Sequence, residues 1–255
     1  MTISQLDRDV RGRLRGLTKD NAETVGRHLV MTGRLLDTDP ELAYEHAQAA
    51  VRRAGRIDVV REAAGLAAYR LGNYAEALRE LRTVRRLNGS SEHLPVMADA
   101  ERGLGRPERA LDLARSPEAE TLDASGRTEL ALVVAGARLD LGQAEAALAV
   151  VDSIPARDVP SVELRYRVDE VRADVLDALG RTDEAAALRL VLGEPDDEIV
   201  VVDLEEDDDQ ADADDERADE ELTADPEPGD AEVAVDSGPS DEQPSDDASS
   251  DEGAR

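Results

Sequence analysis

The sequence predicts an all-α body of repeated helix pairs, followed by a disordered, acidic tail. A recurring motif, small residues in phase with it and a charge confined to one end of the chain all point to this organisation. The 255 residues include 60 acidic and 30 basic side chains, for a net charge of −30. Residues 194–255 hold 28 acidic and two basic residues, so a nearly neutral body is attached to a polyanion.

Four segments of the body share a Leu-Gly turn followed by the start of an alanine-containing helix. They begin at Leu71, Leu104, Leu141 and Leu179 and read LGNYAEAL, LGRPERAL, LGQAEAAL and LGRTDEAA. Their spacings of 33, 37 and 38 residues are close to the period of about 34 residues expected for two helices and a turn. The glycine suits the left-handed residue that ends many helices.

Each of these units also carries a small residue at two fixed distances from the turn glycine. The residues seven places before it are Gly65, Ala98, Ala135 and Ala173, and those five places after it are Ala77, Ala110, Ala147 and Ala185. A larger side chain at either place would push two paired helices beyond their usual separation of about 8–10 Å. The eight positions therefore predict where the helices of each pair approach most closely.

A fifth, earlier helix pair is predicted from a strong helix start. Asp39 is an N-cap acceptor and Pro40 takes the first helical position. This unit lacks the turn glycine, which fits a terminal repeat that caps a stack. The pattern as a whole predicts helices over residues 22–37, 40–54, 57–71, 74–87, 91–104, 107–115, 127–141, 143–153, 162–179 and 182–192, with an extra short helix in 116–126.

Three stretches of the body resemble an uncharacterised family of actinobacterial tetratricopeptide-repeat (TPR) proteins. They read RDVRGRLRGLTKDNAETVGRHLVMTGRLLDTDPELAYEHAQAAVRRAGR, VREAAGLAAYRLGNYAEALRELRTVRRL and LPVMADAERGLGRPERALDLARSPEA. The resemblance covers residues 6–192 and implies a TPR-like α-solenoid of about five helix pairs, a cytoplasmic location and no assigned reaction. It also hints at translation-related partners. The sequence departs from the TPR pattern in lacking Trp, and only Tyr74 holds the usual aromatic place after the turn.

We accordingly divide the chain into a basic N-terminal flank (1–20), a TPR-like helical repeat domain (21–193) and an acidic tail (194–255). The tail is predicted to be disordered, because it cannot bury enough apolar surface to offset its ordering entropy. A short β-prone run at 198–204 interrupts it, with Ile199, Val200, Val201, Val202 and Leu204 as its apolar residues. This run could add a strand to the sheet of a partner, pack on the last helices, or have no pattern at all.

The sequence offers little for catalysis, cofactors or metals. The chain has no Cys, and no two of His28, His46 and His93 have the spacing of a metal pair on one helix. Phosphate-binding loops of the Gly-Lys-Ser/Thr type, GxGxxG turns and GxSxG elbows are absent. We therefore expect a protein that is not an enzyme and holds no cofactor or metal.

Other partner classes are also disfavoured. No apolar run approaches the roughly 20 residues of a membrane span, and the charged N-terminus does not resemble a secretion signal, so we expect a cytoplasmic protein without membrane partners. The basic stretch 8–19 is the one argument for nucleic-acid binding, but Asp7, Asp9 and Asp20 dilute it and no aromatic residue can stack on bases.

These exclusions leave a protein-interaction scaffold that binds a partner peptide or helix in the concave groove of a TPR-like array. The phase of the first helices predicts the groove residues Glu62, Leu66, Tyr69, Arg70, Asp99, Arg102, Leu139 and Arg167. The alternative is a regulator whose acidic tail mimics nucleic acid and binds basic partners, including translation-related proteins. The tail could instead keep the chain soluble, or fold back on the chain's own arginines.

Overall fold

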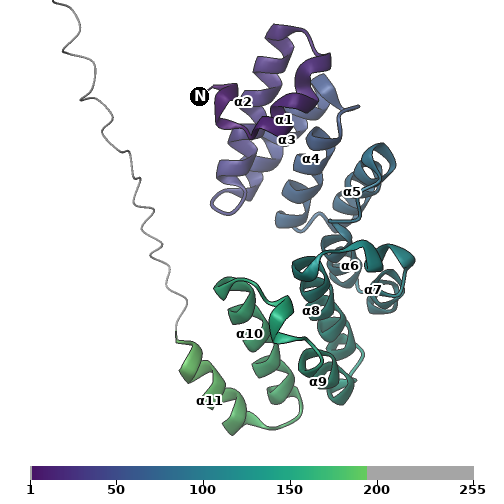
Figure 1. The fold of residues 1–255 in the computed structure, drawn as a ribbon, viewed down its shortest axis with the longest axis vertical. Helices are drawn as coiled ribbons and strands as arrows, with labels where there is room; N and C mark the ends of the chain where they lie inside the picture. The colour runs from purple at the N-terminus through teal and green to yellow at the C-terminus, as the bar shows by residue number, and fades with distance from the viewer. Residues whose placement is uncertain (1, 194–255) are drawn as a thin grey trace, which may run out of the picture. The chain divides into compact units, whose positions relative to one another are not determined.

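The computed structural model describes residues 2–193, which form eleven α-helices and four short 3-10 helices with no strand among them. This confirms the all-α class for that part of the chain (Figure 1). The predicted disordered tail and its 198–204 run lie outside the described residues. No helix in residues 2–193 combines the length and the apolar character needed to cross a membrane.

The α-helices from residue 19 onward follow the predicted order, whereas α1, in the N-terminal flank, was not predicted. The α-helices are α1 (Arg8–Arg13), α2 (Lys19–Leu35), α3 (Pro40–Ala54), α4 (Asp58–Arg70), α5 (Tyr74–Asn88), α6 (Leu94–Gly103), α7 (Pro107–Ala114), α8 (Ala124–Asp140), α9 (Ala144–Asp152), α10 (Val162–Ala178) and α11 (Thr182–Leu192). The 3-10 helices are η1 (Ile3–Gln5), η2 (Leu14–Gly16), η3 (Pro117–Thr121) and η4 (Ala156–Asp158). The short helix expected within 116–126 is therefore η3, and α8 begins three residues earlier than predicted because the Asp123 carboxylate accepts a hydrogen bond from the Gly126 amide.

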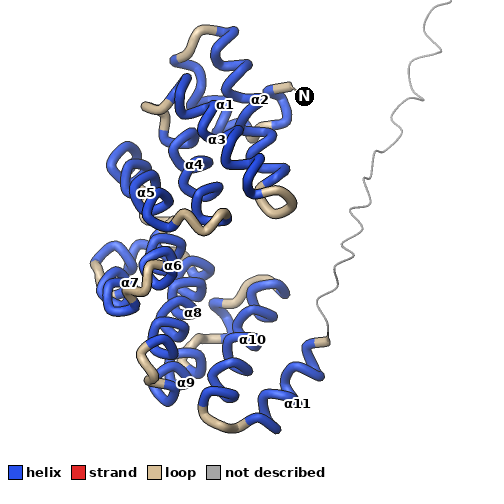
Figure 2. The backbone as a smooth tube through the Cα atoms, turned by 180° about the vertical axis from the view of Figure 1, so that it is seen from behind, coloured by secondary structure: helices blue, strands red, loops and turns tan. Residues whose placement is uncertain are grey.

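Consecutive helices pack as pairs, and the pairs are repeat-like. Within the pairs, α2 packs on α3, α4 on α5, α6 on α7, α8 on α9, and α10 on α11 (Figure 2). Between pairs, α2 contacts α4, α6 contacts α8, and α8 contacts α10. The first helices of successive pairs, named first helices below, therefore lie next to one another at these places and can share a surface.

The turn glycines have the backbone that the repeat predicts. Gly72, Gly105, Gly142 and Gly180 have φ values of 77°, 70°, 69° and 75°, in the left-handed region that favours glycine. In each turn, the amide of the next residue donates to the carbonyl five residues earlier, as from Asn73 to Ala68 at 2.8 Å. This is the Schellman arrangement that ends a helix and satisfies its last carbonyls.

The eight phased small residues are all buried. The seven alanines among them have no exposed surface. At the eighth, a Cβ built on Gly65 would lie 2.7 Å from the Cδ2 atom of Leu81 on the paired helix, which is too close for two carbon atoms. The small side chains are therefore required by the contact between paired helices.

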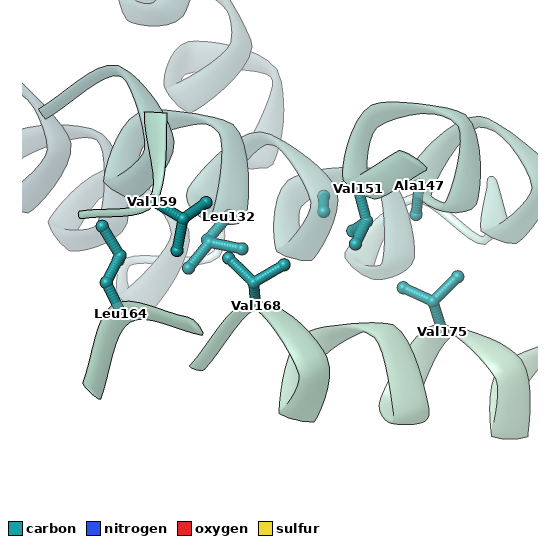
Figure 3. Packing of buried hydrophobic residues seen from close by; sticks show 8 residues of the cluster. Leu132, Ala147, Val151, Val159, Leu164, Val168 and Val175 are labelled. Carbon is teal, nitrogen blue, oxygen red and sulfur yellow. The ribbon is translucent and has the colours of Figure 1, made fainter. Parts of the chain in front are cut away.

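Alanine, valine and leucine form a core without Phe or Trp. In the cluster shown in Figure 3, Leu132 of α8 and Val151 of α9 face Val168 and Val175 of α10, with Ala147 beside them. Because each of these side chains buries little area, many close contacts between helices must contribute to stability.

The N-terminal flank belongs to the first helix pair. Leu14 is 1% exposed and packs with Val25, Leu29 and Val60. A Cβ on Gly26 would lie 2.6 Å from the Cγ1 atom of Ile3, so the glycine allows η1 to lie directly on α2. The apolar residues of the flank recur every three or four positions, and this helical spacing is the sequence signal for its burial. They are Ile3, Leu6, Val10, Leu14 and Leu17.

Buried carboxylates join neighbouring helices, which the sequence analysis did not predict. Glu80 of α5 accepts a 2.7 Å hydrogen bond from Arg61 of α4, and its side chain is 5% exposed. Glu101 of α6 is 3% exposed and lies 2.8 Å from Arg82 of α5. These ion pairs orient one helix relative to the next, because a buried carboxylate is costly unless it is paired.

Candidate functional site

A groove of about 790 Å³ runs along the first helices α4, α6, α8 and α10. Six of the eight residues predicted for the concave face line it, namely Leu66, Tyr69, Arg70, Asp99, Arg102 and Arg167. The phase of the repeat therefore locates one shared surface from residues that are as much as 101 positions apart in the chain, from Leu66 to Arg167.

The other two predicted residues do not line the groove. Leu139 holds the same place in its unit as Tyr69 and Arg102, three residues before the turn glycine, but it packs against the core between α8, α9 and α10. An apolar side chain is stabilised more by burial in that core than by a solvent-exposed position in the groove. Glu62 lies beside the groove, with its Oε1 atom 3.4 Å from Nε2 of the groove residue His93.

A chain of polar contacts links α4 to α8 through three groove residues, Tyr69, Asp99 and Arg102. The Tyr69 hydroxyl donates to Asp99 Oδ2 at 2.5 Å, and Asp99 Oδ1 accepts from Arg102 Nη1 at 2.7 Å. Arg102 also donates to Asp140 of α8, from Nε at 2.8 Å. A Cβ on Gly136 would lie 2.6 Å from the Arg102 guanidinium carbon, so this glycine lets the arginine lie flat on α8.

Burial, followed by the hydrogen bond to Asp99, raises the pKa of the Tyr69 hydroxyl well above its ordinary value of 10.0. The raised pKa keeps the hydroxyl protonated around neutral pH, as a donor to Asp99. The Tyr69 hydroxyl is thus already engaged by a residue of the neighbouring unit.

Two further ion pairs extend this pattern to the ends of the groove. Arg70 of α4 lies 3.1 Å from Asp37, which follows α2, and Arg167 of α10 pairs with Glu129 of α8. The partners are separated in sequence by roughly one repeat, so each pair joins one unit to the next. Phase identified Arg70 and Arg167, but it gave no indication of the carboxylates that they bind.

An apolar strip lies beside the charged residues, and the sequence analysis missed it. Val96, Val133 and Val171 line the groove together with Leu66. The three valines occupy the same place, nine residues before the turn glycine of their units. That phased repetition is the signal that could have found them. A half-buried apolar strip next to arginine and carboxylate groups can bind an amphipathic segment.

Two histidines that are far apart in the sequence meet outside this groove. His28 of α2 and His46 of α3 have their Nδ1 atoms 2.9 Å apart. Burial, and then the charges of His46, Arg53 and Arg52, lower the pKa of His28 below its ordinary value of 6.5. The search for histidine pairs on a single helix could not find this pair, because it spans two helices.

The lowered pKa of His28 predicts a loss of stability in mild acid. As the pH falls from about 7.5 to 5.5, the unfolded chain binds a proton at His28 that the folded chain resists, so the free energy of unfolding decreases. The contribution of His28 is present above 6.5 and is lost as the pH falls through its lowered pKa. Urea titrations at both pH values should show a larger loss for the wild type than for His28→Gln. Equal losses would contradict the assignment.

Comparison with known protein families, with curated proteins and with solved structures finds no match to this chain. The resemblance to actinobacterial TPR proteins therefore stays a prediction. The candidate motif of Ile199, Val200, Val201, Val202 and Leu204 lies outside the described residues, so the groove is the candidate site on which a function can be argued.

Proposed function

We propose that this chain is a cytoplasmic protein-interaction scaffold, a TPR-like α-solenoid that binds a peptide or helix of a partner protein in the groove along its first helices. The observation that carries this proposal is the lining of the groove. Residues at equivalent places of successive repeats, three valines among them, bring apolar and charged side chains to one groove with a volume of about 790 Å³. Repeat proteins commonly bind their partners on such extended surfaces.

The repeating lining favours an elongated ligand. Val96, Val133 and Val171 come from α6, α8 and α10, so together they offer a row of apolar contacts rather than one deep pocket. An amphipathic helix presents its anchors at i, i+3, i+4 and i+7, and an extended peptide presents alternate side chains. Both fit a row of this kind.

The charged side chains would give the partner its orientation. Arg70 and Arg167 stand near opposite ends of the groove and are about half exposed, at 51% and 54% of their side-chain surface. Charged groups at the rim of an interface contribute to specificity and to the rate of association. A ligand with carboxylates toward its two ends and apolar residues between them would share these arginines with Asp37 and Glu129 and cover the valines.

Charge reversal at the ends of the groove tests the proposal. We expect Arg70→Glu/Arg167→Glu to weaken partner binding at least about tenfold, which corresponds to roughly 1.4 kcal/mol. The matched control is Arg86→Glu/Arg109→Glu, which makes the same charge change at exposed positions of the second helices α5 and α7. Pull-down followed by titration of the recovered partner measures both effects, and circular dichroism checks the fold of each variant.

The same experiment separates this proposal from a tail-centred function. If the acidic tail were the active part, both double variants would bind alike, and deletion of residues 194–255 would abolish capture. Binding would then also be lost in salt well below about 0.5 M, because screening shortens the reach of the tail's charge. Under the proposal, deletion of the tail leaves capture intact and only the groove variant loses it.

A further inference from the structure

Three side chains that can bind a metal converge at the edge of the groove. His93 precedes α6, Glu92 precedes it in the chain, and Glu62 projects from α4. The His93 Nε2 atom lies 3.4 Å from Glu62 Oε1 and 3.6 Å from Glu92 Oε1. One ligand atom from each residue lies within 4.8 Å of the other two. In the part of the chain that the structure describes, this is the one group of three or more such residues.

The distances match the geometry of a four-coordinate metal. Zinc binds imidazole nitrogen and carboxylate oxygen at about 2.0–2.2 Å, so two ligand atoms of a tetrahedral site lie roughly 3.3–3.5 Å apart. The two distances from His93 Nε2 are already close to that value. The third pair of ligand atoms lies within 4.8 Å, so a zinc ion would draw the two carboxylates together as it binds.

The surrounding structure holds two of the three ligands in place. Leu94 and Pro95 follow His93 directly and are buried, which fixes the backbone at the start of α6. The Ser90 hydroxyl donates to Glu92 Oε2 at 3.1 Å and accepts from the Glu92 amide at 3.2 Å. This contact orients the Glu92 carboxylate while leaving its Oε1 atom available, as partners around a metal ligand commonly do.

We propose that Glu62, Glu92 and His93 form a zinc site that joins α4 to the start of α6 and keeps one coordination position open. One nitrogen and two oxygen donors suit a zinc ion with three protein ligands. Glu92 and His93 also line the groove, so the open position lies where a bound segment could supply a carboxylate or an imidazole. Zinc binding by the free chain does not depend on the proposed scaffold function, so the two can fail separately.

Calorimetric titration of the full, untagged chain with zinc chloride tests the site. The titration buffer contains millimolar magnesium and about 0.15 M salt, which occupy and screen the many carboxylates of residues 194–255 and so suppress weak zinc binding there. We expect one zinc ion per chain in the micromolar range, roughly −8 kcal/mol. His93→Asn and Glu62→Gln should each weaken binding at least about tenfold, since even residues that only orient a ligand contribute about 10–100-fold. Asparagine keeps a residue suited to the start of a helix at position 93.

His46→Asn is the matched control, because His46 belongs to the other histidine contact and lies on α3. It should leave zinc affinity unchanged. Substitution of zinc by cobalt should give a visible absorption band in the wild type that is lost in His93→Asn and Glu62→Gln but kept in His46→Asn. Zinc affinity that is unchanged in both ligand variants, or the absence of zinc binding under these conditions, would overturn the proposal.

Discussion

Replacing Ala147 by leucine is expected to lower the free energy of unfolding by about 3 kcal/mol, at the upper end of the range for overpacked cores. Ala147 has no exposed surface and lies in the cluster that joins α8, α9 and α10, near Val151 and Val175. Three additional carbon atoms at this place must push α9 away from the neighbouring helices or force side chains out of their rotamers. Both responses weaken contacts on which a core without Phe or Trp depends.

The control for this substitution lies two residues along the same helix. Ala149 is exposed, so Ala149→Leu makes the same chemical change at a place with room for it. We expect that variant to unfold within about 0.5 kcal/mol of the wild type. Urea denaturation followed by circular dichroism compares the three proteins, and equal midpoints for Ala147→Leu and wild type would mean that small residues are not required in the repeat.

Replacing Arg61 by methionine is expected to destabilise the chain by about 3 kcal/mol, near the lower end of the cost of breaking a buried ion pair. Arg61 donates from Nη1 to Glu80 at 2.7 Å and from Nε to the Gly55 carbonyl at 2.6 Å. Methionine keeps much of the apolar stem but leaves the buried Glu80 carboxylate with Arg79 alone, at 3.3 Å. Since the Arg61 side chain is 26% exposed, solvent moderates the loss.

Two further variants show how much of the lost stability comes from the unpaired Glu80 carboxylate. Arg86→Met removes an exposed arginine from α5 and should change stability by less than about 0.5 kcal/mol. Arg61→Met/Glu80→Leu removes both charges, and it should recover part of the loss because the unpaired carboxylate is gone. An Arg61→Met protein with the chemical denaturation midpoint of the wild type would show that this pair does not hold α4 against α5.

The sequence predicted the helices well because their signals are local and repeated. Each turn glycine marks where a helix ends, and Asp39-Pro40 marks where one begins. Both signals depend on the backbone geometry of a few neighbouring residues. The eight small residues then gave the places of closest approach, since a period of about one helix pair fixes which faces meet. Charge sets the flank apart through its arginines, whereas the helical spacing of Leu14 and Leu17 places it in the core of the first helix pair.

The groove was predicted only in part, for a physical reason. Phase tells which side of a first helix faces the groove, so it located Leu66, Tyr69 and Arg102. It does not tell what a side chain will contact there. Leu139 has the same phase as Tyr69 and yet packs into the core, because an apolar side chain gains free energy by doing so.

Contacts between repeats were beyond the reach of spacing rules. The chain from Tyr69 through Asp99 to Arg102, the pair of Glu62 and His93, and the buried Glu80 each depend on how two units are placed in space. Spacing along a sequence indicates partners three or four residues apart on one helix. Partners one repeat apart become visible only once the helices are packed.

Site-specific photo-crosslinking in the cells that make the protein would test most directly that the groove is the binding surface. A photoreactive residue at Val133 or Arg70 places the probe in the groove, whereas one at Arg109 places it on the second helix α7. We predict that the two groove positions crosslink to one shared partner protein, and that position 109 does not. Equal crosslinking of the partner from position 109 would contradict the account. So would a partner that crosslinks at none of the three positions and is retained by the tail alone.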